Sequence, residues 1–395
     1  MKLHKNIYVW HVTSFFSQTA FTLPIWYLFG TQYLHVSSYK AFLLSVATYG
    51  ISALFEIPTG SWADKYGRVK IFRLGSLLYL ASMVSYVLTK NFYILILFQV
   101  VGALGIAMKS GTIEALVHDT LHIGKKQDGY SDLYGRNMAF LYLSRVLTVS
   151  SGAWLFTISP RLPFVMMSVC IFICLLTSLY YEEVRVDTPS ELTSFNHIKE
   201  TIKLVLNQRF LLVVFGISLV YRFVAESLFS LYQPNFKSIG LHAASFGLVY
   251  AFISLCSGVG SLVSGRIIKR FKTTTLLASY FVGLLLSLLL TNTHSSWLVV
   301  LVVLPSALIF GIPNNMVDSL TQRSIRSRYQ STALSVTSLL ETGMFFIAVN
   351  VSGALLDHLG LNAIMNGLIV LCVIGFSLSI LIHARSRAIE QNTLR

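Results

Sequence analysis

Long apolar runs recur along the whole 395-residue chain and are separated by short polar segments. Most runs are about 20 residues long, which matches an α-helix that crosses roughly 30 Å of hydrocarbon. Strands of a membrane barrel would alternate apolar and polar positions over about ten residues, and these runs do not alternate. The pattern predicts twelve membrane-spanning helices, at 7–29, 40–61, 71–89, 91–118, 136–158, 161–181, 210–233, 243–267, 274–292, 296–320, 330–353 and 362–383.

The longest polar gap, 182–209, falls near the middle of the chain and leaves six predicted helices on each side. We therefore expect an all-α membrane protein with two pseudo-symmetric six-helix bundles, 1–182 and 210–395, joined by a cytoplasmic loop at 183–209. A basic loop follows the second predicted helix of each half, and a shift of 205 residues superimposes these loops. Identity between the halves is slight, but the matching loops favour the parallel internal repeat of some transporters.

Basic residues predict the orientation of the helices. With the N-terminus inside, 23 of the 30 Lys and Arg residues fall in cytoplasmic segments, 4 fall outside, and Lys109, Arg145 and Arg222 lie within helices. Cytoplasmic loops carry such an excess of positive charge. We expect a multi-pass protein of a bacterial inner membrane with both termini in the cytoplasm. The net charge of +14 is then explained without a nucleic-acid partner.

Composition and missing motifs exclude other classes. Only 12% of the residues are charged, against about 25% in a typical soluble domain. No nucleotide-binding loop, nucleophile elbow or metal-spaced histidines are present. The four cysteines lie inside apolar runs and are expected to be buried thiols. The sequence thus predicts neither an enzyme nor a metal or cofactor site.

The loop between the second and third predicted helices reads Gly60-Ser-Trp-Ala-Asp64-Lys-Tyr-Gly67-Arg68-Val-Lys70. Asp64 can meet a helix N-terminus or a cation, Gly67 permits a turn with positive φ, and Arg68 offers a planar fork for a carboxylate. The segment closely resembles the signature loop G-x-x-A-D-[RK]-x-G-R-[RK] of the major facilitator superfamily of secondary transporters, which lies at the same place in the fold.

The resemblance implies a twelve-helix fold, alternating access, and a latch that closes the cytoplasmic side. In the family the arginine of the loop meets an acid at the end of the fourth helix, where this chain has Asp119. The predicted latch comprises Glu56, Gly60, Asp64, Gly67, Arg68 and Asp119. The drug-antiporter subgroup is not established, because Phe98 stands where those proteins carry an arginine and the segment around Gly152 lacks their proline.

Ionisable side chains within the helices are candidates for coupling or substrate binding, because each costs roughly 2.5–3.5 kcal/mol at mid-membrane. Glu114 is the first candidate for proton coupling, or else a structural partner of Lys109 or Arg145. Arg222 and Glu226 are spaced to pair on one helix face, either for structure or for substrate. Glu341 is the second proton candidate and has no evident partner. The full candidate set is Gln18, Lys109, Glu114, Arg145, Arg222, Glu226, Asn314 and Glu341.

These features favour a transporter that exports an amphipathic organic compound in exchange for protons. The alternative is an importer or facilitator of a polar or anionic metabolite, held by one of the basic residues within the helices. A non-transporting sensor or scaffold has less need of a latch. The expected partners are a small-molecule substrate and the lipid bilayer, with a monomeric protein and the proton as coupling ion.

Overall fold

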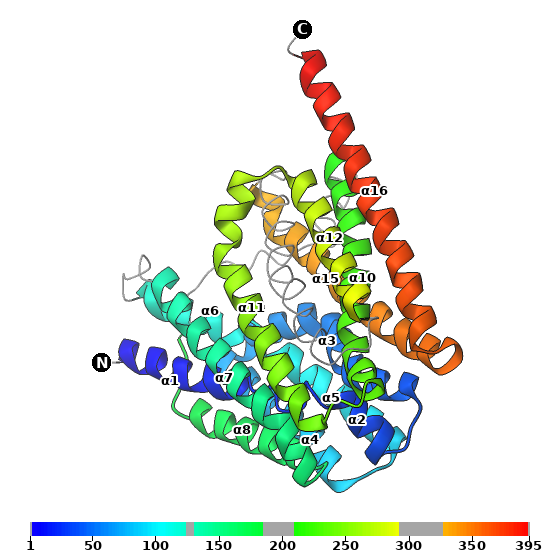
Figure 1. Cartoon of the computed structure of the whole chain (residues 1–395). Coiled ribbons are helices and arrows are strands. Elements are labelled where there is room, and N and C mark those ends of the chain that lie inside the picture. Colours follow the sequence, from blue (N-terminus) through cyan, green and yellow to red (C-terminus); the bar gives the residue numbers. More distant parts are fainter. Residues whose placement is uncertain (1, 124–129, 185–208, 292–326, 394–395) are drawn as a thin grey trace. The chain divides into compact units, whose positions relative to one another are not determined.

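The computed structural model describes residues 2–123, 130–184, 209–291 and 327–393, and within these ranges it contains helices and no strand (Figure 1). The elements are α1 (Lys2–Ser17), α2 (Trp26–Leu28), a π-helical turn η1 (Phe29–Tyr33), α3 (Ser38–Tyr66), α4 (Arg68–Leu88), α5 (Phe92–Lys109), α6 (Thr112–Ile123), α7 (Tyr130–Ile158), α8 (Leu162–Ser178), α10 (Arg209–Ser238), α11 (Ala243–Arg270), α12 (Thr273–Thr291), α15 (Ser327–Leu359) and α16 (Leu361–Thr393).

Apolar length confirms a multi-pass membrane protein. In the described part of the chain, eight helices are long and apolar enough to cross a bilayer. The two parts of α3, bent by 61° between Glu56 and Pro58, would make a ninth. The predicted helix at 296–320, with the candidate Asn314, lies outside the described residues.

The chain divides into two compact units. Unit 1 comprises Met1–Pro189 and His242–Ala251, and unit 2 comprises Ser190–Leu241 and Phe252–Arg395. In unit 1, α4 packs closely against α5 and α8, and α3 packs against α5. In unit 2, α10 packs against α15 and α16, and α12 packs against α16. The predicted domain limits at 182 and 210 remain predictions.

The first predicted helix, 7–29, is wrong as a continuous helix. It ends at Ser17, and helical structure resumes only at α2. Pro24 lies in the break, where it removes a backbone donor and disfavours helix at the preceding residue. The backbone N–H of Ala20 donates to the hydroxyl of Thr148 on α7 at 2.9 Å. A donor that has lost its helical partner at membrane depth is thereby satisfied from a neighbouring helix.

Gly152 on α7 lets the non-helical segment after α1 pack closely against α7. A Cβ atom at this position would lie 2.0 Å from the carbonyl oxygen of Phe21 and 2.7 Å from its carbonyl carbon. These are backbone atoms, so no side-chain rotation can relieve the overlap. The packing of α7 against the break therefore requires glycine here.

We expect Gly152→Ala to lower the stability of the purified protein, because overpacking costs roughly 1–3 kcal/mol. A thermal unfolding scan in detergent measures this as a fall in the melting temperature. Gly216→Ala on α10 is the matched control, because a Cβ there would have no neighbour within 4 Å. Equal melting temperatures for the two variants would contradict the proposed packing.

The fourth predicted helix, 91–118, is also interrupted. It forms α5 and α6, which are separated at Ser110 and Gly111, and Gly111 has a φ of 65°. The two parts still make one apolar stretch, Phe92–Leu121. The break places Lys109 in the last turn of α5, where the helix dipole favours a positive charge.

Candidate functional site

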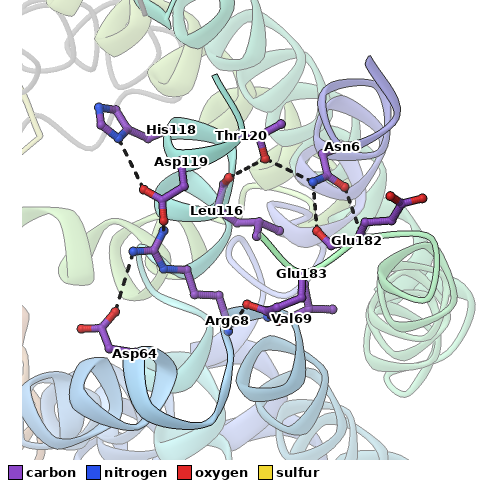
Figure 2. A network of polar contacts seen from close by, with 10 residues as sticks. All are labelled: Asn6, Asp64, Arg68, Val69, Leu116, His118, Asp119, Thr120, Glu182 and Glu183. Carbon is purple, nitrogen blue, oxygen red and sulfur yellow. Dashed lines mark hydrogen bonds and ion pairs between the residues drawn. The ribbon is translucent and has the colours of Figure 1, made fainter. Parts of the chain in front are cut away.

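The signature loop folds as the end of α3, a turn at Gly67 and the start of α4 (Figure 2). The φ of Gly67 is 105°, a value that side-chain-bearing residues rarely adopt. Its N–H still donates to the carbonyl of Ala63 at 3.0 Å, which closes α3. The predicted turn is confirmed, and it places Arg68 at the first position of α4.

Arg68 is the centre of an ion-pair network at this turn (Figure 2). Its Nη1 lies 2.5 Å from Oδ2 of Asp119 at the end of α6, and its Nη2 lies 3.7 Å from Oδ1 of Asp64. The side chains of Arg68 and Asp119 are 19% and 15% exposed, whereas that of Asp64 is 64% exposed. Since solvent screens exposed pairs, the contact with Asp119 is the stronger one. The family resemblance led us to expect this contact.

Glu183, which the sequence reading missed, caps the start of α4. Its two carboxylate oxygens accept the backbone N–H groups of Arg68 at 2.8 Å and Val69 at 2.9 Å. Unpaired N–H groups and the positive end of the dipole both favour a carboxylate at a helix N-terminus. The available signal was the pair of adjacent acids directly after the sixth predicted helix.

The neighbouring acid, Glu182, ties the start of α1 to the same network. Its backbone exchanges two hydrogen bonds with the side chain of Asn6, each of 3.0 Å, and its carboxylate lies 3.2 Å from Nζ of Lys5. The amide of Asn6 also donates to the hydroxyl of Thr120 on α6. Segments far apart in sequence thus meet around the loop (Figure 2).

Two residues of the predicted latch do not join these contacts in the part of the chain that the structure describes. Glu56 is exposed and makes no ion pair there. A Cβ at Gly60 would have no neighbour within 4 Å, so no helix approaches that position closely among the described elements. Asp64, Gly67, Arg68 and Asp119 are brought together.

The predicted pair of Glu114 with Lys109 or Arg145 is not formed within the described ranges. Nζ of Lys109 instead lies 5.2 Å from the ring centre of Tyr79 and 5.7 Å from that of Phe72, both on α4. Aromatic faces attract cations at such distances. Glu114 lies in the first turn of α6.

Gln18 and Arg145 are exposed and belong to neighbouring segments of unit 1. Gln18 directly follows the end of α1, and Arg145 lies in the spanning part of α7. The hydroxyl of Ser144 donates to the carbonyl of Phe15. With the bond from Ala20 described above, it fixes the end of α1 alongside α7.

The position equivalent to the drug antiporters' arginine adjoins a neutral network. The amide of Gln99 donates to the carbonyl of Leu44 and the hydroxyl of Tyr86, and its oxygen accepts from Thr48. The side chain is buried, and its hydrogen bonds tie α3, α4 and α5 together. Gln99 therefore serves packing and supplies no charge.

Unit 2 contains a cluster of three charged side chains within spanning helices. Arg222 and Glu226 lie one turn apart on α10, with Nη2 and Oε1 3.8 Å apart. Glu341 on α15 reaches the same guanidinium, with Oε2 3.3 Å from Nη1. Exposure is 22% for Arg222 and 17% and 16% for the two carboxylates. The contact between the first two was expected from their spacing, whereas Glu341 gains a partner 119 positions away.

Comparison with known proteins agrees with this architecture. The sequence profile of the Major Facilitator Superfamily matches residues 9–349. Multidrug resistance protein 2 of Bacillus subtilis (strain 168) is 25% identical over 224 residues, which are 55% of this chain and 54% of that protein. The chain thus matches only about half the length of this curated relative.

Solved structures show the same fold at low identity. The nucleoside transporter NupG superimposes with a TM-score of 0.76 at 13% identity, covering 97% of this chain and 99% of that one. The D-xylose-proton symporter gives 0.70 at 12% identity, covering 96% and 97%. Together with the family match, these likenesses make the chain an all-α protein with the twelve-helix fold, a transporter and not an enzyme. The chain belongs to the major facilitator superfamily of secondary transporters.

Proposed function

We propose that this transporter couples the movement of a small organic solute to that of protons, and that Arg222, Glu226 and Glu341 carry the coupling proton. The observation that supports this is the sharing of one guanidinium by two carboxylates inside spanning helices. The apolar parts of the described spanning helices contain few other charged side chains.

The electrostatics of the three groups favour a proton in the cluster. With both carboxylates ionised, the three groups together carry one more negative than positive charge. Excess charge in a medium of low polarity is costly, and such groups commonly neutralise by taking up a proton. Protonation of Glu226 or Glu341 would bring the sum to zero. The cluster would then alternate between two charge states as it faces one side of the membrane and the other.

Export of an amphipathic compound is the proposed direction. It is supported by the similarity to Multidrug resistance protein 2, limited to about half of each chain. The second candidate is proton-coupled import of a polar or anionic metabolite, favoured by the exposed cation Arg145 in a spanning helix. In both cases Arg68 and Asp119 would act as the latch that closes the cytoplasmic side, with both termini in the cytoplasm.

Everted membrane vesicles that contain the protein test the proposal. We expect an imposed proton gradient, acid inside, to drive accumulation of at least one compound from a panel of amphipathic dyes and labelled metabolites. Addition of a protonophore should abolish the accumulation. Accumulation indifferent to the protonophore would contradict proton coupling. Uptake into right-side-out vesicles, acid outside, without any in everted ones would favour import over export.

A further inference from the structure

We propose that Arg145 on α7 binds an anionic group of the transported solute, a carboxylate or a phosphate, with Gln18 beside it. The solute is therefore an organic anion with an apolar body. This inference rests on the proposed transport of a small organic solute, but it does not depend on proton coupling.

Of the three basic residues that the sequence places within helices, Lys109, Arg145 and Arg222, only Arg145 has its charge left available in the described part of the chain. Lys109 lies over the rings of Phe72 and Tyr79. Arg222 contacts two carboxylates. The guanidinium of Arg145 makes neither an ion pair nor a hydrogen bond with any described residue.

The face of α7 that carries Arg145 is not the lipid-facing one. Leu143 and Leu147 are exposed and lie about 160° around the helix from Arg145, at roughly 100° per residue. Val149 and Gly152 lie within about 40° of Arg145 by the same spacing, and both are buried.

Arg145 therefore lies on the protein-facing side of α7, at a point where that side is exposed. The buried face at Val149 and Gly152 becomes exposed one turn earlier along α7. An exposed guanidinium on a protein-facing surface at membrane depth is expected to face a water-filled path. In a transporter such a path is the route of the solute.

Polar and aromatic groups for a bound solute lie nearby. Ser144 and Thr148 hold the segment 15–20, which contains the exposed Gln18, against this part of α7. The half-exposed side chain of Tyr49 on α3 lies within range of the charge of Arg145. A planar guanidinium suits two oxygens of a carboxylate or phosphate. An amide and an aromatic ring beside it suit the rest of an aromatic anion.

The test uses the purified full-length protein in detergent without any pH gradient. The probes share one ring system: 1-naphthoate and 1-naphthyl phosphate are anions, and 1-naphthamide is a neutral analogue of the carboxylate. We expect at least one anion to raise the melting temperature of the wild type in a saturable manner, because a ligand that binds the folded state stabilises it. The neutral amide should have little effect.

Arg145→Gln should weaken this binding at least tenfold, and Arg145→Lys should retain part of it. Arg161→Gln is the matched control. Arg161 is also an exposed arginine, but it precedes α8 and contacts Tyr33. Its replacement should leave anion binding unchanged. The ligand-free melting temperature of Arg145→Gln should equal or exceed that of the wild type.

Four outcomes would overturn the proposal. These are an equal effect of the neutral amide, unchanged anion binding by Arg145→Gln, no stabilisation by either anion, and a large fall in the ligand-free melting temperature of Arg145→Gln. The last would mean that Arg145 holds a structural partner. Anion binding that persists while a proton gradient drives no transport would leave this inference intact and refute the proposed coupling alone.

Discussion

Glu341→Gln is expected to abolish proton-driven accumulation of the solute, with at least a hundredfold loss of the initial rate, while the protein stays folded. The reason is the charge sum of the cluster. Glutamine resembles a carboxyl group that is always protonated, so Arg222 and Glu226 remain as a pair with no net charge. No proton is then needed, and none is carried. Exchange of solute down its own gradient should continue, because it requires no change of charge.

Vesicles loaded with labelled solute measure both activities in one preparation. Glu226→Gln is expected to behave in the same way, since Arg222 and Glu341 would then balance each other. The double variant Glu226→Gln with Glu341→Gln leaves the guanidinium without either carboxylate and should be strongly destabilised, by about 3–5 kcal/mol. Proton-driven accumulation that survives in both single variants would exclude the cluster as the coupling site.

Asp119→Asn is the change expected to weaken the proposed latch most. It removes the charge of the carboxylate that lies 2.5 Å from Arg68 in a mostly buried position. Hydrogen bonds to charged groups contribute about 1.5–3 kcal/mol, so the melting temperature of the purified protein should fall clearly. Asp64→Asn is the control, because its carboxylate is exposed and 3.7 Å away. Its effect should lie within about 1 kcal/mol.

A double-mutant cycle separates this contact from other effects of the substitutions. Arg68→Gln, Asp119→Asn and the combined variant are compared with the wild type. A coupling free energy of about 1–2 kcal/mol is expected for groups in direct contact. Additive effects of the two single variants would show that the contact contributes nothing to the stability of this state.

Apolar length predicted most of the helices, because a span of hydrocarbon must be crossed by backbone that satisfies its own hydrogen bonds. The first break was missed because it depends on a tertiary contact. At the first break a hydroxyl on α7 satisfies the freed N–H of Ala20, and such a tertiary contact leaves no mark on local hydropathy. Pro24 and Gly111 were the only local signals of the two breaks. Proline and glycine also occur inside continuous helices of this chain, such as Pro234 in α10.

In the candidate site too, contacts set by local sequence were predictable, whereas contacts set by helix packing were not. The contact of Arg222 with Glu226 depends on helical spacing alone and was predictable. The contact with Glu341 depends on how α10 packs against α15, which one sequence does not reveal. The turn at Gly67 followed from its residue type, whereas the cap by Glu183 joins positions 115 residues apart. Lys109 lies over aromatic rings of α4 and forms no ion pair with Glu114 in the described structure. This position likewise depends on packing against α4.

Proton uptake by the Arg222 cluster is measured most directly by infrared difference spectroscopy of the protein in lipid, recorded across a pH titration. Acidification of the wild type should produce the band of a protonated carboxyl, and both Glu341→Gln and Glu226→Gln should lose it. Glu114→Gln, the matched change in unit 1, should keep the band. A band that persists in both variants of the Arg222 cluster and disappears in Glu114→Gln would contradict proton coupling at this cluster and place the coupling proton on α6.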